Sequence, residues 1–113
     1  MTSKEVPFGV TDWKDIPPVE HKGELGSSFW RDLDVGNVHV HLAEYSPGYK
    51  ADGWCSTGHI LYVLKGQLIT ELKDGRVFTI NAGQSYQVSD SVSNPHRSRT
   101  DRGATLFIVD WPA

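Results

Sequence analysis

The sequence predicts an all-β fold for this chain of 113 residues. Glycine and proline, with 11 and 6 residues, are spread along the whole chain, and they favour short strands joined by turns over long helices. Short apolar runs are separated by turn signals roughly every 8 to 12 residues, which is typical of a sandwich or a small barrel. No helical periodicity persists beyond about two turns.

The N-terminal part is predicted to form an irregular arm over residues 1–28, followed by a barrel over residues 29–113. Prolines and glycines interrupt any regular element in the arm. Phe8, Trp13 and Ile16 are nevertheless too apolar for a solvated tail. We therefore expect an ordered arm that packs along the barrel or across a partner subunit, with a frayed terminus as the alternative.

The strands of the barrel are predicted from turn residues that close apolar or alternating runs. Val38–Tyr45 alternates and ends at Ser46-Pro47-Gly48, where proline fixes one turn dihedral and glycine supplies the next. Asp74-Gly75 lies between two apolar runs and predicts a hairpin with a type I′ turn, which needs positive φ at both central residues. Further strands are predicted over 59–64, 67–72, 76–80, 85–88, 96–100 and 104–109.

Length, cysteine content and charge exclude several classes of protein. A chain of this length is expected to form one domain, and its single cysteine, Cys55, cannot form an internal disulfide and fits a reducing compartment. The net charge of -3 and the absence of a basic run argue against a nucleic acid or an anionic membrane as partner. No segment has the length of a membrane span or the layout of a signal peptide. We expect a soluble cytoplasmic protein.

Two glycine-punctuated segments resemble the two sequence motifs of the cupin family. In the first, Gly53, Cys55 and His59 occupy the positions of the two histidines and the glutamate, and Gly66 closes the motif. The spacing of the second motif is matched by Gly75, Asn81, Gly83, Tyr86 and Asp90. The proline, histidine and asparagine of that motif are substituted here.

More narrowly, the chain resembles a group of small single-domain cupins labelled by an Asp-His-Cys-Trp motif, which here reads Asp52-Gly53-Trp54-Cys55 without the histidine. The supporting segments are 8–13, 44–49, 58–61, 85–88, 96–98 and 106–110. The resemblance implies a double-stranded β-barrel of the jelly-roll type. Cupins commonly bind one divalent metal at the barrel mouth for dioxygenation, isomerisation, decarboxylation or lyase chemistry, and others bind small molecules without a metal.

Cys55, His59 and His96 are the candidate metal ligands. Thiolate and imidazole are good ligands for zinc, nickel or iron, and three protein ligands leave a position open for substrate or water. Cys55 and His59 can converge across a turn, and His96, after Asn94-Pro95, can point into the same cavity. The alternative is that Cys55 is a small buried hydrophobe, His59 hydrogen-bonds Tyr86 inside the barrel, and His96 lies at the surface.

Tyr86 is the candidate catalytic residue, as a general acid or base. Its ordinary pKa of about 10 means that it needs a metal or a cationic neighbour to ionise, and the alternative is a ring that fills the barrel with a hydrogen-bonded hydroxyl. Trp54 and Tyr62 line either the pocket or the core. His39 and His41 point the same way along one strand, and because these positions look basic and outward in the resembled group, we interpret them as a solvent or interface face.

The sequence therefore predicts a small cupin that binds a small organic molecule in its barrel cavity. One hypothesis adds a divalent transition metal (Zn, Ni or Fe) and oxygenase-, isomerase- or lyase-type chemistry. The other is a metal-free barrel with a binding or structural role, and the loss of the first histidine and the glutamate favours it. We expect a homodimer formed through sheet edges and the aromatic arm, because a jelly roll leaves edges to cover.

Overall fold

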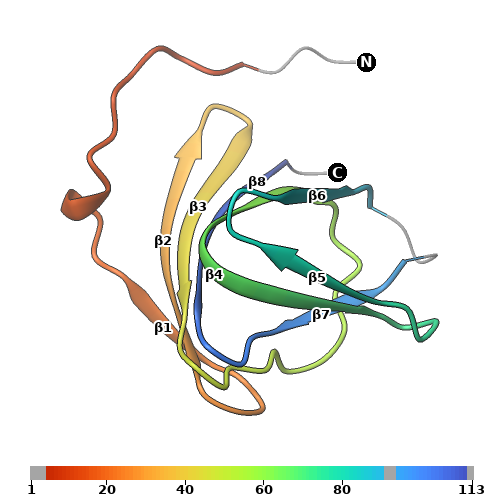
Figure 1. Cartoon of the computed structure of the whole chain (residues 1–113). Helices are drawn as coiled ribbons and strands as arrows, with labels where there is room; N and C mark the ends of the chain where they lie inside the picture. The colour runs from red at the N-terminus through yellow and green to blue at the C-terminus, as the bar shows by residue number, and fades with distance from the viewer. Residues whose placement is uncertain (1–4, 91–93, 112–113) are drawn as a thin grey trace.

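The computed structural model describes residues 5–90 and 94–111, so the first four residues of the predicted arm and the last two of the predicted barrel lie outside it. Antiparallel strands dominate the described chain, and none of its residues forms an α-helix (Figure 1). The elements are the 3-10 helix η1 (Trp13–Asp15) and the strands β1 (Val19–Lys22), β2 (Ser27–Val35), β3 (Val38–Tyr45), β4 (His59–Leu72), β5 (Val77–Asn81), β6 (Ser85–Val88), β7 (His96–Arg99) and β8 (Ala104–Asp110). The all-β prediction is confirmed.

Two antiparallel sheets share the long strand β4. The first half of β4 pairs with β6 and β8, and β8 continues through β3 and β2 to β1. The second half of β4 pairs with β5 and β7 to form the smaller sheet. In Figure 1, β4 curves across the barrel from one sheet to the other. This arrangement confirms the predicted jelly-roll barrel.

The prediction of two separate strands over 59–64 and 67–72 is wrong. Gly66 does not end the strand but lies at its bend, next to a register shift between Val63 and Lys65. Gly66 has φ +77, and a Cβ there would overlap the carbonyl oxygen of Gly103. Only glycine tolerates both conditions, so β4 can pass from one sheet into the other without a break.

The other predicted strands agree with the structure to within one residue at their ends, and 38–45 and 85–88 are reproduced as β3 and β6. The hairpin at Asp74-Gly75 is confirmed, but its turn is not type I′. Gly75 has φ +100, whereas no described residue other than glycine has positive φ. The Gly75 N–H donates to Leu72 O at 3.0 Å, and Leu72 N–H donates to Arg76 O at 2.8 Å. The connection is therefore a three-residue loop with its glycine in the left-handed position.

Strands β1 and β2 are absent from the predicted set. Strand β2 has no clear hydrophobic pattern because its acidic residues pair with histidines. Asp32 lies opposite His41, and Asp34 lies opposite His39. These charged residues share the inward face of β2 with Ser28 and Trp30. The alternation of polar and apolar residues that marks a half-buried strand is therefore weak.

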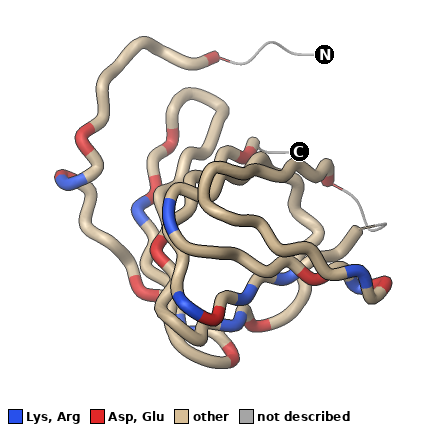
Figure 2. The backbone as a smooth tube through the Cα atoms, in the orientation of Figure 1, with Lys and Arg blue, Asp and Glu red and all other residues tan. Residues whose placement is uncertain are grey.

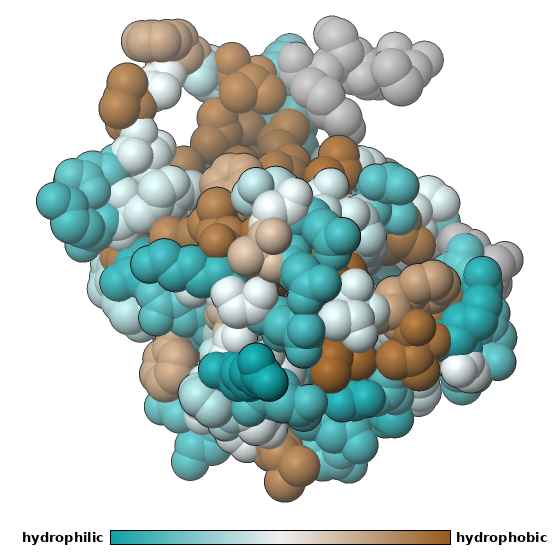
Figure 3. Space-filling model, in the orientation of Figure 1, coloured by the Kyte–Doolittle hydropathy of each residue, from teal (hydrophilic) through white to brown (hydrophobic). Residues whose placement is uncertain are grey.

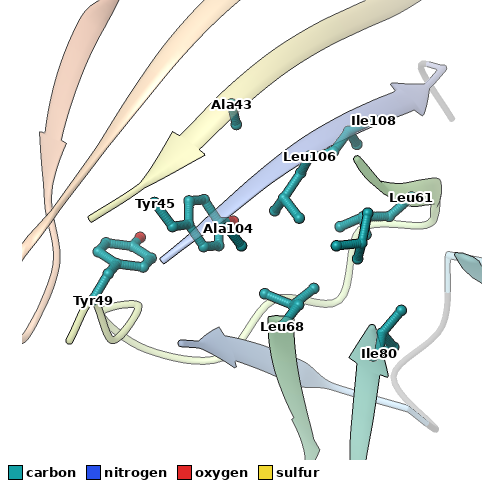
Figure 4. Packing of buried hydrophobic residues seen from close by; sticks show 10 residues of the cluster. Ala43, Tyr45, Tyr49, Leu61, Leu68, Ile80, Ala104, Leu106 and Ile108 are labelled. Carbon is teal, nitrogen blue, oxygen red and sulfur yellow. The ribbon is translucent and has the colours of Figure 1, made fainter. Parts of the chain in front are cut away.

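The hydrophobic core lies between the two sheets (Figure 4). Its most enclosed side chains are Leu61, Val63, Leu68 and Leu106, which come from β4 and β8. At one end of the core, the rings of Tyr45 and Tyr49 approach to 4.5 Å between centroids. Alternate residues of β4 and β8 point inward, and this alternation carries the site residues of β4 into the barrel.

The N-terminal arm follows the outer side of β2 (Figure 1). Trp13 packs edge-on against Phe107, with 6.2 Å between ring centroids, and the Arg31 Nε–H donates to Ile16 O at 2.9 Å. The side chains of Phe8 and Val10 are nevertheless 98% and 90% exposed. The arm is thus held to the barrel while its apolar middle faces solvent.

Acidic and basic residues are interspersed along the backbone in Figure 2, as the sequence predicts. Within the described ranges, no helix has the length and apolar character needed to cross a membrane.

A candidate binding cavity inside the barrel

A cavity of about 400 Å³ lies within the barrel. Five aromatic residues contribute to its wall: Trp30, Tyr45, Tyr49, Trp54 and Tyr86. Its polar groups include those of His41, Cys55, His59, Tyr86, His96, Ser98 and Asp110. A concave space of this size, with a largely apolar wall and a few convergent polar groups, has the usual form of a small-molecule site.

His59 and Tyr86 contact each other in the wall of this cavity. His59 begins β4 on the inward face that it shares with Leu61, and Tyr86 lies directly opposite Leu61 on β6. The Tyr86 hydroxyl is 2.7 Å from His59 Nε2, and the imidazole also forms a hydrogen bond to the backbone of Thr57. The imidazole donates to the Thr57 carbonyl, so its Nε2 accepts the hydrogen of the Tyr86 hydroxyl.

Burial keeps both members of this pair neutral. Burial, and to a smaller degree the neighbouring His96, lowers the pKa of His59 to about 4. Burial also raises the pKa of Tyr86 above its ordinary value. At neutral pH the pair is therefore a neutral imidazole and a protonated phenol, and Tyr86 serves as a hydrogen-bond donor.

His96 approaches the same pair from β7. Its ring centroid lies 5.0 Å from that of His59, and the residue is only 3% exposed. Nδ1 lies 3.1 Å from Asn94 O and donates to it, whereas the buried Nε2 has no hydrogen-bond partner among the described residues. The structure thus places an unpaired acceptor atom beside His59 and Tyr86.

Cys55 lies at the mouth of the cavity. Two backbone hydrogen bonds of 2.8 and 2.9 Å pair it with His96, so the two side chains project from the same face of the sheet. The thiol is exposed, and its Sγ accepts the Thr57 N–H at 3.4 Å. The alternative of a buried hydrophobic cysteine is therefore wrong.

Trp54 and Tyr62, which were predicted to line the pocket or the core, lie in different parts of the structure. Trp54 lies at the rim of the cavity, where the guanidinium carbon of Arg97 stacks 4.4 Å from its ring centroid. Tyr62 is 42% exposed on the outward face of β4 and is not among the residues described as lining a cavity. Of the predicted site residues, Cys55, His59, Tyr86, His96 and Trp54 thus surround one cavity.

The donor atoms of this cluster do not fit a metal ion as they are arranged. In the described part of the chain, no group of three or more His, Cys, Asp or Glu side chains could hold a metal. Both nitrogens of His59 are used in hydrogen bonds, whereas His96 Nε2 is buried without a partner among the described residues. The Cys55 Sγ accepts one backbone N–H, which leaves the sulfur able to bind a metal.

His41 is a cavity residue that the sequence analysis missed. Its Nδ1 lies 2.7 Å from Asp32 and its Nε2 lies 2.8 Å from Asp110, so two carboxylates hold its ring in place. The interpretation of His41 as part of an outward face is wrong, because it lines the cavity and shares its face of β3 with Ala43 and Tyr45, whereas the side chain of His39 is 40% exposed, as that interpretation predicts. A usable signal was present in the sequence, since Asp32 and Asp34 repeat with the same period of two just before this strand.

No family model and no curated protein match the sequence. Solved structures do share its architecture: an RmlC-like cupin from Shewanella frigidimarina superposes with a TM-score of 0.75 at 15% identity, over 96% of this chain and 95% of that chain. The protein has the cupin fold. The resemblance seen in the sequence is confirmed at the level of fold, and membership of the Asp-His-Cys-Trp group stays a prediction.

Two further solved structures share the fold of this chain. Ectoine synthase from P. lautus has a TM-score of 0.76 at 16% identity, over 93% of this chain and 78% of that chain. An Fe(II)-bound HppE, crystallised with an alternative substrate, has a TM-score of 0.74 at 13% identity, over 92% of this chain and 60% of that chain. At these identities the likeness establishes the fold, and function has to be argued from the cavity itself.

Proposed function

We propose that this cupin binds a small organic molecule, without a metal, in the cavity around His59 and Tyr86. The supporting observation is the neutral His59–Tyr86 pair at the centre of an aromatic-walled cavity of about 400 Å³. The aromatic side chains supply apolar contact area, and the polar groups fix the orientation of a ligand. Asp110 and His41, which also line the cavity, offer a second polar contact.

Tyr86 has the role of anchor in this proposal. Its phenol stays protonated because burial raises its pKa, and because its hydrogen is donated to His59 Nε2, its oxygen is free to accept a hydrogen bond from a bound molecule. Cys55 and Trp54 form the mouth through which the ligand enters. Tyr86 could act as a proton donor in catalysis only by releasing its hydrogen bond to His59.

A screen of small organic fragments by two-dimensional NMR tests the proposal. Bound fragments should shift the amide resonances of Cys55, His59 and Tyr86, and Tyr86→Phe should weaken them about fivefold, the worth of one net hydrogen bond. Tyr62→Phe is the matched control, because it removes a tyrosine hydroxyl from the outer face of β4. Equal weakening by both variants, or hits that map only to the outer face, would contradict the proposal.

A metal-dependent activity is the second candidate, and it rests on the free Nε2 of His96. Zinc, nickel or iron held by Cys55, His59 and His96 would require His59 to give up its bond to Tyr86. The metal content of the purified protein, measured beside Cys55→Ala and His59→Ala, decides between the candidates. Stoichiometric metal that both substitutions remove would overturn the metal-free proposal, whereas traces that respond to neither would eliminate the second candidate.

We also propose that the protein is a cytoplasmic homodimer. The dimer is supported by two exposed apolar surfaces. The arm exposes Phe8 and Val10, and the outer face of β4 exposes Ile60, Tyr62 and Leu64. Figure 3 shows hydrophobic atoms on the arm at the upper left and on the part of the barrel below it. A second copy could cover both surfaces at once. The exposed Cys55 thiol is compatible with a reducing compartment.

A further inference from the structure

Several polar groups in the wall of the barrel cavity accept hydrogen bonds. Tyr86 donates its hydrogen to His59 Nε2, so toward a ligand it acts as an acceptor. The buried Nε2 of His96, in the same wall, is an acceptor without a partner among the described residues. Asp110 adds a carboxylate, which only accepts hydrogen bonds. A ligand that suits this wall therefore supplies hydrogen-bond donors.

Asp110 brings its carboxylate into the cavity from the end of β8. It follows Leu106 and Ile108 on the inward face of that strand, and both of these side chains point into the core in Figure 4. The side chain of Asp110 is 22% exposed, and its Oδ2 lies 2.8 Å from His41 Nε2. A carboxylate has about four lone-pair sites, so Asp110 can still accept a hydrogen from a ligand.

The group of side chains around Asp110 is negatively charged in every protonation state of its histidines. Asp32 and Asp110 form hydrogen bonds with His41, and Asp34 forms one with His39. Three carboxylates thus accompany two imidazoles. Even if both imidazoles carry a proton, one negative charge remains in excess, and it favours a cation nearby.

The negative charge acts inside the cavity. Burial lowers the pKa of His59 to about 4, and the charge of Asp110 opposes this shift. Arg97 is the one Lys or Arg among the described residues that line the cavity. Its guanidinium lies 3.0 Å from the Glu71 carboxylate and stacks on Trp54 at the rim. The only cationic side chain of the described lining is thus already paired.

We propose that the ligand of this cavity is a small organic amine, bound as its ammonium ion. The ammonium group donates to Asp110, and the apolar body lies against the aromatic wall, which includes Trp30 and Tyr45. An aromatic face also attracts a cation directly. An ammonium group combines a positive charge with several donors, whereas a carboxylate offers neither. This inference rests on the binding function proposed above and names the class of its ligand.

Three probes with the same phenylethyl body test the preference for an amine: 2-phenylethylamine, 2-phenylethanol and 3-phenylpropanoate. Each is titrated into the full chain at neutral pH and followed by two-dimensional NMR. We expect the amine to shift the amides of His59, Tyr86 and Ile108. It should bind about tenfold more tightly than the alcohol, because a hydrogen bond between charged partners is stronger than a neutral one. The carboxylate should bind most weakly.

Asp110→Asn tests the residue that carries the proposal, because it removes the charge and keeps the shape of the side chain. The variant should reduce the preference for the amine over the alcohol about tenfold. Asp15→Asn is the matched control. It removes the same charge from an exposed residue of η1 that does not line the cavity, and it should leave the preference unchanged. The ranking of the three probes is measured on the wild type, so it does not depend on whether Asp110→Asn folds.

The outcomes separate this inference from the function on which it rests. If the alcohol or the carboxylate shifts the same amides and binds as tightly as the amine, the amine preference is overturned and the binding function stands. The same holds if none of the three probes shifts these amides while the fragment screen gives hits there. If the screen gives no hits in the cavity either, both proposals are overturned.

Discussion

The hydroxyl of Tyr86 lies 2.7 Å from Nε2 of His59 and ties β6 to β4 inside the barrel. The motif resemblance gives both residues positions that hold metal ligands in cupins. Here the two side chains bind each other, and burial keeps each of them neutral. Several consequences of this pair and of its surroundings can be measured.

Replacing Tyr86 with phenylalanine should destabilise the protein by about 1 to 2 kcal/mol, because the buried Nε2 of His59 loses its hydrogen-bond donor. Urea unfolding of the variant and the wild type measures the difference. Tyr62→Phe, on the outer face of β4, should change the free energy of unfolding by less than about 0.5 kcal/mol. An equal loss in both variants would show that the His59 contact contributes nothing.

The stability of the protein should fall as the pH drops from about 6.5 to about 4. His59 has an ordinary pKa of 6.5 that burial lowers to about 4 in the folded protein. Between these values the unfolded chain takes up a proton and the folded chain does not, so acid favours unfolding, by up to about 3 kcal/mol. Above about pH 6.5, His59 contributes no pH dependence to the stability of the protein.

Urea unfolding at a series of pH values checks this window. Glu71 also makes the protein less stable in acid, because Arg99 and Arg97 lower the pKa of its carboxyl in the folded state. The comparison with His59→Gln isolates the histidine, since the variant should show a flatter pH dependence between pH 4 and 6.5. Parallel curves for the two proteins would refute the assignment.

Gly66→Ala should be among the most damaging single substitutions in β4. The added methyl group would overlap the carbonyl oxygen of Gly103, and alanine disfavours φ +77. We expect a loss of about 3 kcal/mol or more in chemical denaturation. Gly83→Ala is the control, because Gly83 has a similar φ of +91 but open space around its Cβ position, and it should cost about 1 kcal/mol.

Substitution of the apolar arm should weaken the proposed dimer. The double variant Phe8→Ser and Val10→Ser removes two side chains that are 98% and 90% exposed in the single chain. Analytical ultracentrifugation should show a dimer dissociation constant at least about tenfold higher than that of the wild type. Val77→Ser, which removes an exposed apolar side chain from β5, should have no such effect. A wild-type protein that stays monomeric at all concentrations would refute the dimer.

Strands bounded by strong turn residues could be predicted from the sequence, and β3 is the clearest case. Which face of β3 meets the core could not be predicted. Its apolar residues Val38, Val40 and Leu42 alternate with His39 and His41, and a period of two identifies two faces without saying which of them meets the core. The face that carries the histidines is set by their carboxylate partners. His39 forms a hydrogen bond with Asp34, and His41 forms hydrogen bonds with Asp32 and Asp110.

The site was predictable in part for a related reason. Motif spacing brought Cys55, His59 and Tyr86 together correctly, because spacing follows from the lengths of strands and turns. Spacing does not say which atoms are already bonded. The hydrogen bond between His59 and Tyr86 depends on two strands meeting in one register, and the free Nε2 of His96 depends on the backbone of Asn94.

Because β4 belongs to both sheets, neither sheet can be completed without it. β4 pairs with β8 and β6 in one sheet and with β5 and β7 in the other. Opening it would expose both sheets together, so its central amides should exchange their hydrogens with solvent only when the whole barrel unfolds. The edge strand β1, which pairs with β2 alone, can open without that event. The barrel thus unfolds as one cooperative unit whose slowest-exchanging amides lie on a single strand.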